Sequence, residues 1–269
     1  MFEVISLGSG SSGNTLLIRA GQSTLLVDCG VGIRRLAPAL HKQGLEIADI
    51  DAVLITHEHG DHIRELPRFV GAGATILCTA GSSRATGIPS SSWEVSVPGR
   101  PVQLDGVEIV AIAVSHDAAE PCGFLVRTPF GSLSVMTDLG CASPAAAEAI
   151  AESQLVVLEA NHDEAMLRRG PYPAHLQRRI LSDSGHLSND ACGELLVAAL
   201  HGSRHLPTVW LAHLSETNNR PATAARTVER RLAQAGLRLD LHVLPRRDTG
   251  VRWTPESAKR GSSQLALGF

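Results

Sequence analysis

The heptapeptide Thr-His-Glu-His-Gly-Asp-His, residues 56–62, places three histidines and two acidic residues within seven positions. It follows Asp-Ala-Val-Leu-Ile, residues 51–55, a short apolar run that is typical of a buried strand. A solvated charged loop would instead be rich in Lys and Glu. The heptapeptide is therefore predicted to be the loop that leaves a buried strand, where a rigid backbone can hold chemically active side chains.

The spacing His57-x-His59-x-Asp61-His62 favours metal binding. Side chains at positions i and i+2 of an extended loop point the same way, so His57 and His59 can hold one ion. Asp61 and His62 can face a second ion beside the first. Four side chains cannot fill two metal sites, so further ligands must come from other segments.

Three further candidates each end an apolar strand: His116 after VEIVAIAVS, Asp138 after SLSVMT and His213 after TVWLA. Alone, such a histidine would be a capped core residue and such an aspartate the start of a turn. Together with the cluster at 57–62 they complete a predicted site for two ions, in which the carboxylate of Asp138 suits a bridging position. Histidine and carboxylate ligands suit zinc or manganese, and the sequence does not choose between them.

The order of predicted elements indicates an α+β fold in which two sheets pack face to face with helices outside. Each half of the chain contributes strands followed by helices. Predicted helices include 32–43, 62–70, 144–152, pieces of 162–200, and 221–236. Residues 1–246 are predicted to form one domain, and residues 247–269 a polar, disordered tail.

Bulk properties exclude several classes of protein. The hydrophobic fraction of 43% supports a full core, and the net charge of −3 does not by itself indicate a polyanion partner. Five cysteines without a C-x-x-C pair indicate reduced thiols and a cytoplasmic location. The first residues are predicted to form a strand rather than a signal peptide. No apolar run reaches the length of about 18 residues that spans a membrane.

The metal-ligand order resembles that of the metallo-β-lactamase superfamily, whose fold is an αββα sandwich with a dinuclear site at one edge. The resemblance covers about residues 2–245. Shorter motifs resemble the YycJ/WalJ branch of that superfamily: SLGSGSSGNT at 6–15, DCG at 28–30, TDLG at 137–140, LEANHD at 158–163, GHLSN at 185–189 and LAHLSETNN at 211–219. Lactamases proper usually have Cys at the position of Asp138, so the aspartate places this chain with the hydrolases and nucleases.

The resemblance implies one metal ion on His57, His59 and His116, a second on Asp61, His62 and His213, and Asp138 between them. It implies a 5′→3′ DNA exonuclease of DNA repair, in which a metal-bound hydroxide attacks the phosphodiester and Asp61 orients it. The site is similar to those of ribonucleases Z and J. Alternatives are an RNA-processing nuclease, or a small-molecule hydrolase such as a cyclic phosphodiesterase or thioester hydrolase. The complete ligand set argues against an inactive binding module.

Several residues are predicted around the metals. His186 and Ser188 of GHLSN could donate to a substrate phosphate, with His186 acting in the transition state, although Ser188 could simply cap the next helix. Asn161 and His162 are expected to line the substrate site, and the alternative role for His162 is that of a metal ligand. Asp28 is either an acceptor that fixes a ligand histidine or an ordinary turn residue.

Other surface features leave two interpretations open. The segment 8–14, GSGSSGN, is read as a tight hairpin that could line the mouth of the site. Five basic residues, Arg168, Arg169, His175, Arg178 and Arg179, form either a lip for a nucleic-acid backbone or a solvated helix face. The low aromatic content mildly favours recognition of a DNA duplex or its end over stacking on single strands.

The end of the chain has an unexpected composition. After the polar stretch ESAKRGSS come Gln264, Leu265, Leu267 and Phe269. This hexapeptide resembles the peptides by which bacterial repair and replication proteins bind the sliding clamp, in which the Gln makes polar contacts and the apolar side chains fill a pocket. The alternatives are chance and folding back onto a groove of the chain's own domain.

Overall fold

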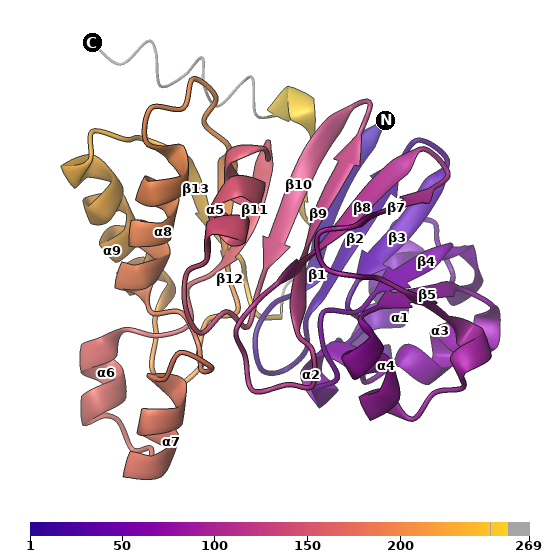
Figure 1. The fold of residues 1–269 in the computed structure, drawn as a ribbon, viewed down its shortest axis with the longest axis horizontal. Helices are drawn as coiled ribbons and strands as arrows, with labels where there is room; N and C mark the ends of the chain where they lie inside the picture. The colour runs from indigo at the N-terminus through magenta and orange to yellow at the C-terminus, as the bar shows by residue number, and fades with distance from the viewer. Residues whose placement is uncertain (248, 258–269) are drawn as a thin grey trace.

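The computed structural model describes residues 1–247 and 249–257 and has two mixed sheets, packed face to face, at its centre (Figure 1). The first sheet has the order β14 (Val251–Trp253), β1 (Phe2–Gly8), β2 (Thr15–Ala20), β3 (Ser23–Val27), β4 (Ala52–Leu54), β5 (Thr75–Cys78) and β6 (Trp93–Val95). The second has the order β13 (Asp240–Val243), β12 (Thr208–Ala212), β11 (Leu155–Glu159), β10 (Gly131–Met136), β9 (Cys122–Thr128), β8 (Val107–Ala113) and β7 (Pro101–Leu104). The predicted α+β sandwich is confirmed.

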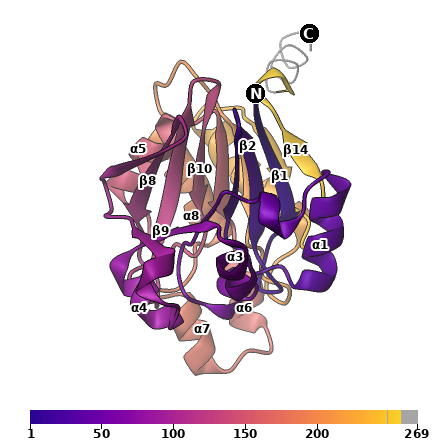
Figure 2. The same ribbon diagram turned by 90° about the vertical axis from the view of Figure 1, so that its right-hand side faces the viewer.

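Helices lie outside both sheets (Figures 1 and 2). On the side of the first sheet are α1 (Ile33–Lys42), α3 (Leu66–Ala72) and α4 (Ala80–Thr86), together with the short 3₁₀ turns Ile47–Asp49 and Ser90–Ser92. On the outer face of the second sheet are α5 (Pro144–Ala151), α8 (Asn189–Leu200) and α9 (Pro221–Gln234). Near one edge of the sandwich lie α2 (Gly60–Ile63), α6 (Glu164–Arg169) and α7 (Ala174–Ile180). None of the helices in the described ranges has both the length and the hydropathy needed to cross a bilayer.

The strands are apolar on both faces because each sheet is covered on both sides. In β11, Leu155 and Val157 join the core between the sheets, whereas Val156 and Leu158 pack under the outer helices. Burying each such side chain contributes about 1.5–3 kcal/mol. This double burial holds the strands rigid up to the residues where they end.

Three of those ends have an unusual backbone. Asp28, Asp138 and His213 follow β3, β10 and β12 and have left-handed φ angles of 59°, 55° and 53°. This region is disfavoured for residues other than glycine, and such strain concentrates at functional sites. All three belong to the predicted site.

Two predicted boundaries are wrong. The helix predicted at 62–70 is split into α2 and α3. The tail predicted from 247 is interrupted by β14, which pairs with β1 and brings Trp253, 2% exposed, against Phe2 with the ring centroids 5.8 Å apart. The burial of this tryptophan explains why the sheet continues past the predicted boundary. The hexapeptide at 264–269 lies outside the described residues.

Candidate metal centre

The loop 56–62 is held in place by two neighbouring segments. The backbone N–H of Cys29 donates to the carbonyl of His62 at 2.7 Å, and that of Asn14 donates to the carbonyl of Asp61 at 2.9 Å. A Cβ on Gly30 would lie 1.6 Å from the Asp61 carbonyl oxygen. The glycine of the DCG sequence is therefore needed for this close approach of two backbones.

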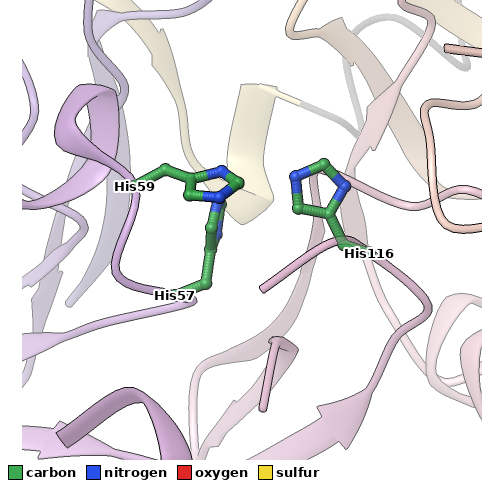
Figure 3. Close-up of side chains that lie close together, drawn as sticks. All are labelled: His57, His59 and His116. Atoms are coloured by element: carbon green, nitrogen blue, oxygen red, sulfur yellow. The ribbon is translucent and has the colours of Figure 1, made fainter. Parts of the chain in front are cut away.

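The first ligand group consists of His57, His59 and His116, whose candidate ligand atoms all lie within 4.8 Å of one another. Figure 3 shows His57 and His59 rising from one loop and His116 approaching from the opposite side. The ring centroids of His57 and His116 are 5.1 Å apart. Burial lowers the pKa of His57 well below its usual value, and the neighbouring His62 lowers it further. His57 is therefore held as a neutral imidazole, the form that binds metals.

The second ligand group consists of Asp61, His62 and His213. Asp138 lies between the two groups. Its Oδ2 is 3.0 Å from Nε2 of His62, and its Oδ1 is 3.7 Å from Nε2 of His116. Seven side chains from segments far apart in the sequence thus lie close together, and two of the four candidate groups in the described part of the chain have the residues that the resemblance implies.

Hydrogen bonds fix the orientation of the ligand histidines. The Nδ1 atom of His62 lies 2.7 Å from Asp28, that of His213 lies 2.8 Å from Glu159, and that of His116 lies 2.9 Å from the carbonyl of Gly185. With an N–H donated at Nδ1, each ring presents Nε2 as a lone pair toward the centre. Asp28, which is 2% exposed and also accepts from the backbone N–H and hydroxyl of Thr56, therefore has the predicted fixing geometry.

The residues fit a pair of divalent cations. Among the described residues, the buried atoms without a hydrogen-bond partner include Nε2 of His57, Nε2 of His213 and Oδ2 of Asp138. Unsatisfied buried polar atoms are costly, and metal coordination would satisfy them. Burial alone would lower the pKa of His62, but the charges of Asp28 and Asp138 raise it to about 10. The carboxylates of Asp28 and Asp138 therefore favour positive charge at this position, which a cation would supply.

Glu159 is a central residue that the sequence analysis missed. It is fully buried at the end of β11, and its carboxylate accepts from Nδ1 of His186 at 2.9 Å and from Nδ1 of His213 at 2.8 Å. It also accepts from the backbone N–H groups of Leu139 and Leu187. Burial raises its pKa, but His186 and His213 lower it to about 2. The sequence feature that could have revealed Glu159 is the position of an acidic residue at the end of an otherwise apolar strand.

The residues predicted to touch the substrate separate into two sets. His186 is 22% exposed in its side chain and lies with its Nδ1 3.4 Å from Asp138, and Asn161 lines the same pocket as His186. Ser188 instead caps α8 by accepting from the N–H of Ala191, as its alternative interpretation required. His162 is 1% exposed and so presents almost no surface to a substrate. Neither of its ring nitrogens has a hydrogen-bond partner. None of the candidate metal-binding groups among the described residues includes His162.

The segment 8–14 includes the hairpin loop between β1 and β2, and it contacts two residues of the second ligand group. The Nδ2 atom of Asn14 lies 3.1 Å from Nε2 of His62, and the Ser9 hydroxyl accepts from the N–H of His213 at 2.8 Å. The Oδ1 of Asn14 accepts from the N–H of Gly10 at 2.7 Å, which closes the loop on itself. The segment is thus both a tight hairpin and a wall of the site.

Comparison with known proteins identifies the family. The model of the "Beta-lactamase superfamily domain" matches residues 23–210. The chain is 35% identical over 244 residues to exodeoxyribonuclease WalJ of Streptococcus pneumoniae, covering 88% of this chain and 90% of WalJ. It is 34% identical over 241 residues to exodeoxyribonuclease YycJ of Bacillus anthracis, covering 86% of this chain and 89% of YycJ.

A solved structure supports the same fold. The metallo-β-lactamase fold protein YhfI from Bacillus subtilis superposes with a TM-score of 0.70 at 15% identity, over 94% of this chain and 98% of YhfI. At that identity the likeness concerns the fold alone. From the family model and the two relatives that match most of its length, this chain belongs to the metallo-β-lactamase superfamily of metal-dependent hydrolases and, within it, to the family of WalJ and YycJ.

Proposed function

We propose that this protein is a 5′→3′ DNA exonuclease of DNA repair that uses two divalent metal ions, zinc or manganese. The observation that supports this most is the convergence of two ligand groups around Asp138 with His186 directly beside them. Such a centre suits hydrolysis of a phosphodiester, in which negative charge develops next to the attacking and leaving oxygens. We propose DNA as the substrate because the relatives WalJ and YycJ are both named exodeoxyribonucleases.

In this proposal each group of residues has a separate role. His57, His59 and His116 would hold one cation, Asp61, His62 and His213 would hold the other, and the carboxylate of Asp138 lies next to both groups. When bound, the two cations would lower the pKa of a water molecule and neutralise phosphate charge. Asp61, with a quarter of its side chain exposed, orients the attacking water, and His186 meets the phosphate or the leaving oxygen.

The substrate can be tested with one duplex labelled at either end. We expect release of mononucleotides from a free 5′ end in the presence of Mn²⁺ or Zn²⁺, and no release when that end is closed in a hairpin. Comparing the cleavage rates of this duplex with those of its separate single strands and of RNA with the same sequence measures the preference for duplex DNA. Cleavage of RNA alone would favour the RNA-processing alternative, and hydrolysis of small esters without any nuclease activity would favour a small-molecule hydrolase.

A cytoplasmic location is part of the proposal, because all five cysteines are free and four of them are buried. Thiols of this kind persist in a reducing compartment. The proposed partner besides DNA is a bacterial sliding clamp, bound through Gln264, Leu265, Leu267 and Phe269. A connection of this kind would raise the local concentration of the nuclease at DNA without new contacts to the catalytic domain.

The clamp interaction predicts that a peptide of residues 258–269 binds the sliding clamp of the same organism, and that replacing Leu267 and Phe269 by alanine abolishes binding. Isothermal titration against a known clamp peptide measures this directly. Deleting residues 264–269 should leave activity on short free DNA unchanged and remove any stimulation by the clamp. If the peptide fails to bind at high micromolar concentration while the known peptide binds, the clamp proposal is wrong.

A further inference from the structure

A small pocket adjoins the candidate metal centre on the side of His186. Its volume is about 180 Å³. Its walls come from segments far apart in the chain, namely Ser11, Asp117, Asn161, Tyr172, Leu176, Arg179, Ile180, Gly185, His186 and Ser215. Four of these residues, at 172, 176, 179 and 180, belong to the α6–α7 hairpin, residues 164–180, which lies at the same edge of the molecule as α2 (Figures 1 and 2).

The lining of the pocket combines one aromatic residue with several polar and charged residues. Tyr172, the only tyrosine of the chain, and Leu176 are both half-buried. The carbonyl of Tyr172 accepts from the Gln177 side chain at 2.8 Å, which fixes the loop to α7. Asn161 and Ser215, both buried, add polar atoms to the lining. An aromatic residue beside several hydrogen-bonding side chains is a combination that can hold a nucleobase.

Arg179 differs from the other arginines of the hairpin. Its guanidinium binds the Asp117 carboxylate at 2.5 Å, and the other oxygen of Asp117 lies 3.3 Å from Nε2 of His116. This holds Arg179 at the rim between the pocket and the first ligand group. Arg168, by contrast, pairs with Glu164 on its own helix at 3.4 Å. A planar guanidinium in this position suits a phosphate oxygen.

We propose that this pocket receives the terminal nucleoside of the DNA strand, with its base against Tyr172 and its phosphate between Arg179 and His186. The volume lies below the roughly 300–1,000 Å³ of pockets that enclose drug-sized ligands, so it accommodates one base rather than two. The hairpin would thereby make the enzyme release one nucleotide at a time. This inference rests on the proposed function and names the substrate unit of the same site.

A thermodynamic cycle between the protein and the substrate tests the pocket. The two substrates are 5′-phosphorylated duplexes whose terminal nucleotide carries either thymine or an abasic tetrahydrofuran. We expect the wild-type kcat/KM to fall about tenfold when the base is absent, which is within the range for loss of a base stacked on an aromatic ring. Tyr172→Ala should show the same fall on the thymine substrate and no further fall on the abasic one. Tyr172→Phe should retain the wild-type rates.

Phe130→Ala is the matched control, because Phe130 is an exposed aromatic residue in the turn between β9 and β10. It should cleave both substrates as the wild type does. If Tyr172→Ala slows cleavage of both substrates by the same factor, the ring has only a structural role and the pocket proposal is wrong.

Failure of the proposed function would look different, because the wild type would then release no nucleotide from either duplex. In that case thymidine 5′-monophosphate serves as the probe, with binding followed by saturation-transfer NMR. Binding that is lost in Tyr172→Ala and kept in Phe130→Ala supports the pocket. Equal binding by the two variants overturns it.

Discussion

Replacing Asp138 by asparagine is expected to lower the metal content of the purified protein from about two ions per chain and to reduce nuclease activity about 10³-fold or more. Asp138 is 2% exposed and lies between the two ligand groups, so its carboxylate is the side chain that both cations would share. A metal pair stabilises transition-state charge by several kcal/mol, and about 4 kcal/mol corresponds to this loss in rate. Mass-spectrometric metal analysis and single-turnover kinetics measure the two effects.

Asp105→Asn provides the matched control for Asp138→Asn. Asp105 also has a left-handed backbone, with φ 45°, but it lies exposed in the turn between β7 and β8. Asparagine tolerates this conformation, so neither substitution introduces backbone strain of its own. A wild-type protein that holds no more than one ion after metal-loaded purification would contradict the dinuclear proposal.

Replacing His186 by alanine is expected to leave the metal content unchanged while lowering kcat about 10²–10³-fold. His186 has its Nδ1 on Glu159, and its ring lines the pocket beside the ligand groups. A group that meets only the phosphate or leaving oxygen contributes to the transition state and not to metal affinity. Metal analysis of the variant, together with kcat and KM on the same DNA, separates these effects.

The outcome also distinguishes three roles for His186. Loss of metal together with activity would make it a ligand, which is relevant because it shares a group with Asp138, Glu159 and His213. Unchanged activity would make it a neighbour of the α8 cap without a catalytic role. His205→Ala is the control, since His205 is an exposed histidine in the loop before β12 and is expected to have no effect on either measurement.

The fold class and the seven candidate ligands can be predicted from the sequence alone. The strands can be predicted because burial on both faces requires nearly continuous hydrophobic runs, which are visible in the sequence. Candidate ligands can be predicted because metal-binding side chains need a rigid backbone, which the end of a buried strand provides. His116, Asp138 and His213 each follow such a strand. Both signals are local, so they can be read without knowing which segments are neighbours.

The residues that orient the ligands and form the substrate side could not be identified without the three-dimensional arrangement of the chain. Glu159 accepts from His186 and His213, which lie 27 and 54 positions away along the chain. Nothing in its local sequence specifies those partners, because they come from loops that meet only when the sheet has formed. The same holds for the pairing of β14 with β1 and for the contact of Arg179 with Asp117. Long-range contacts of this kind depend on strand order and register, which the spacing of residues along the chain does not encode.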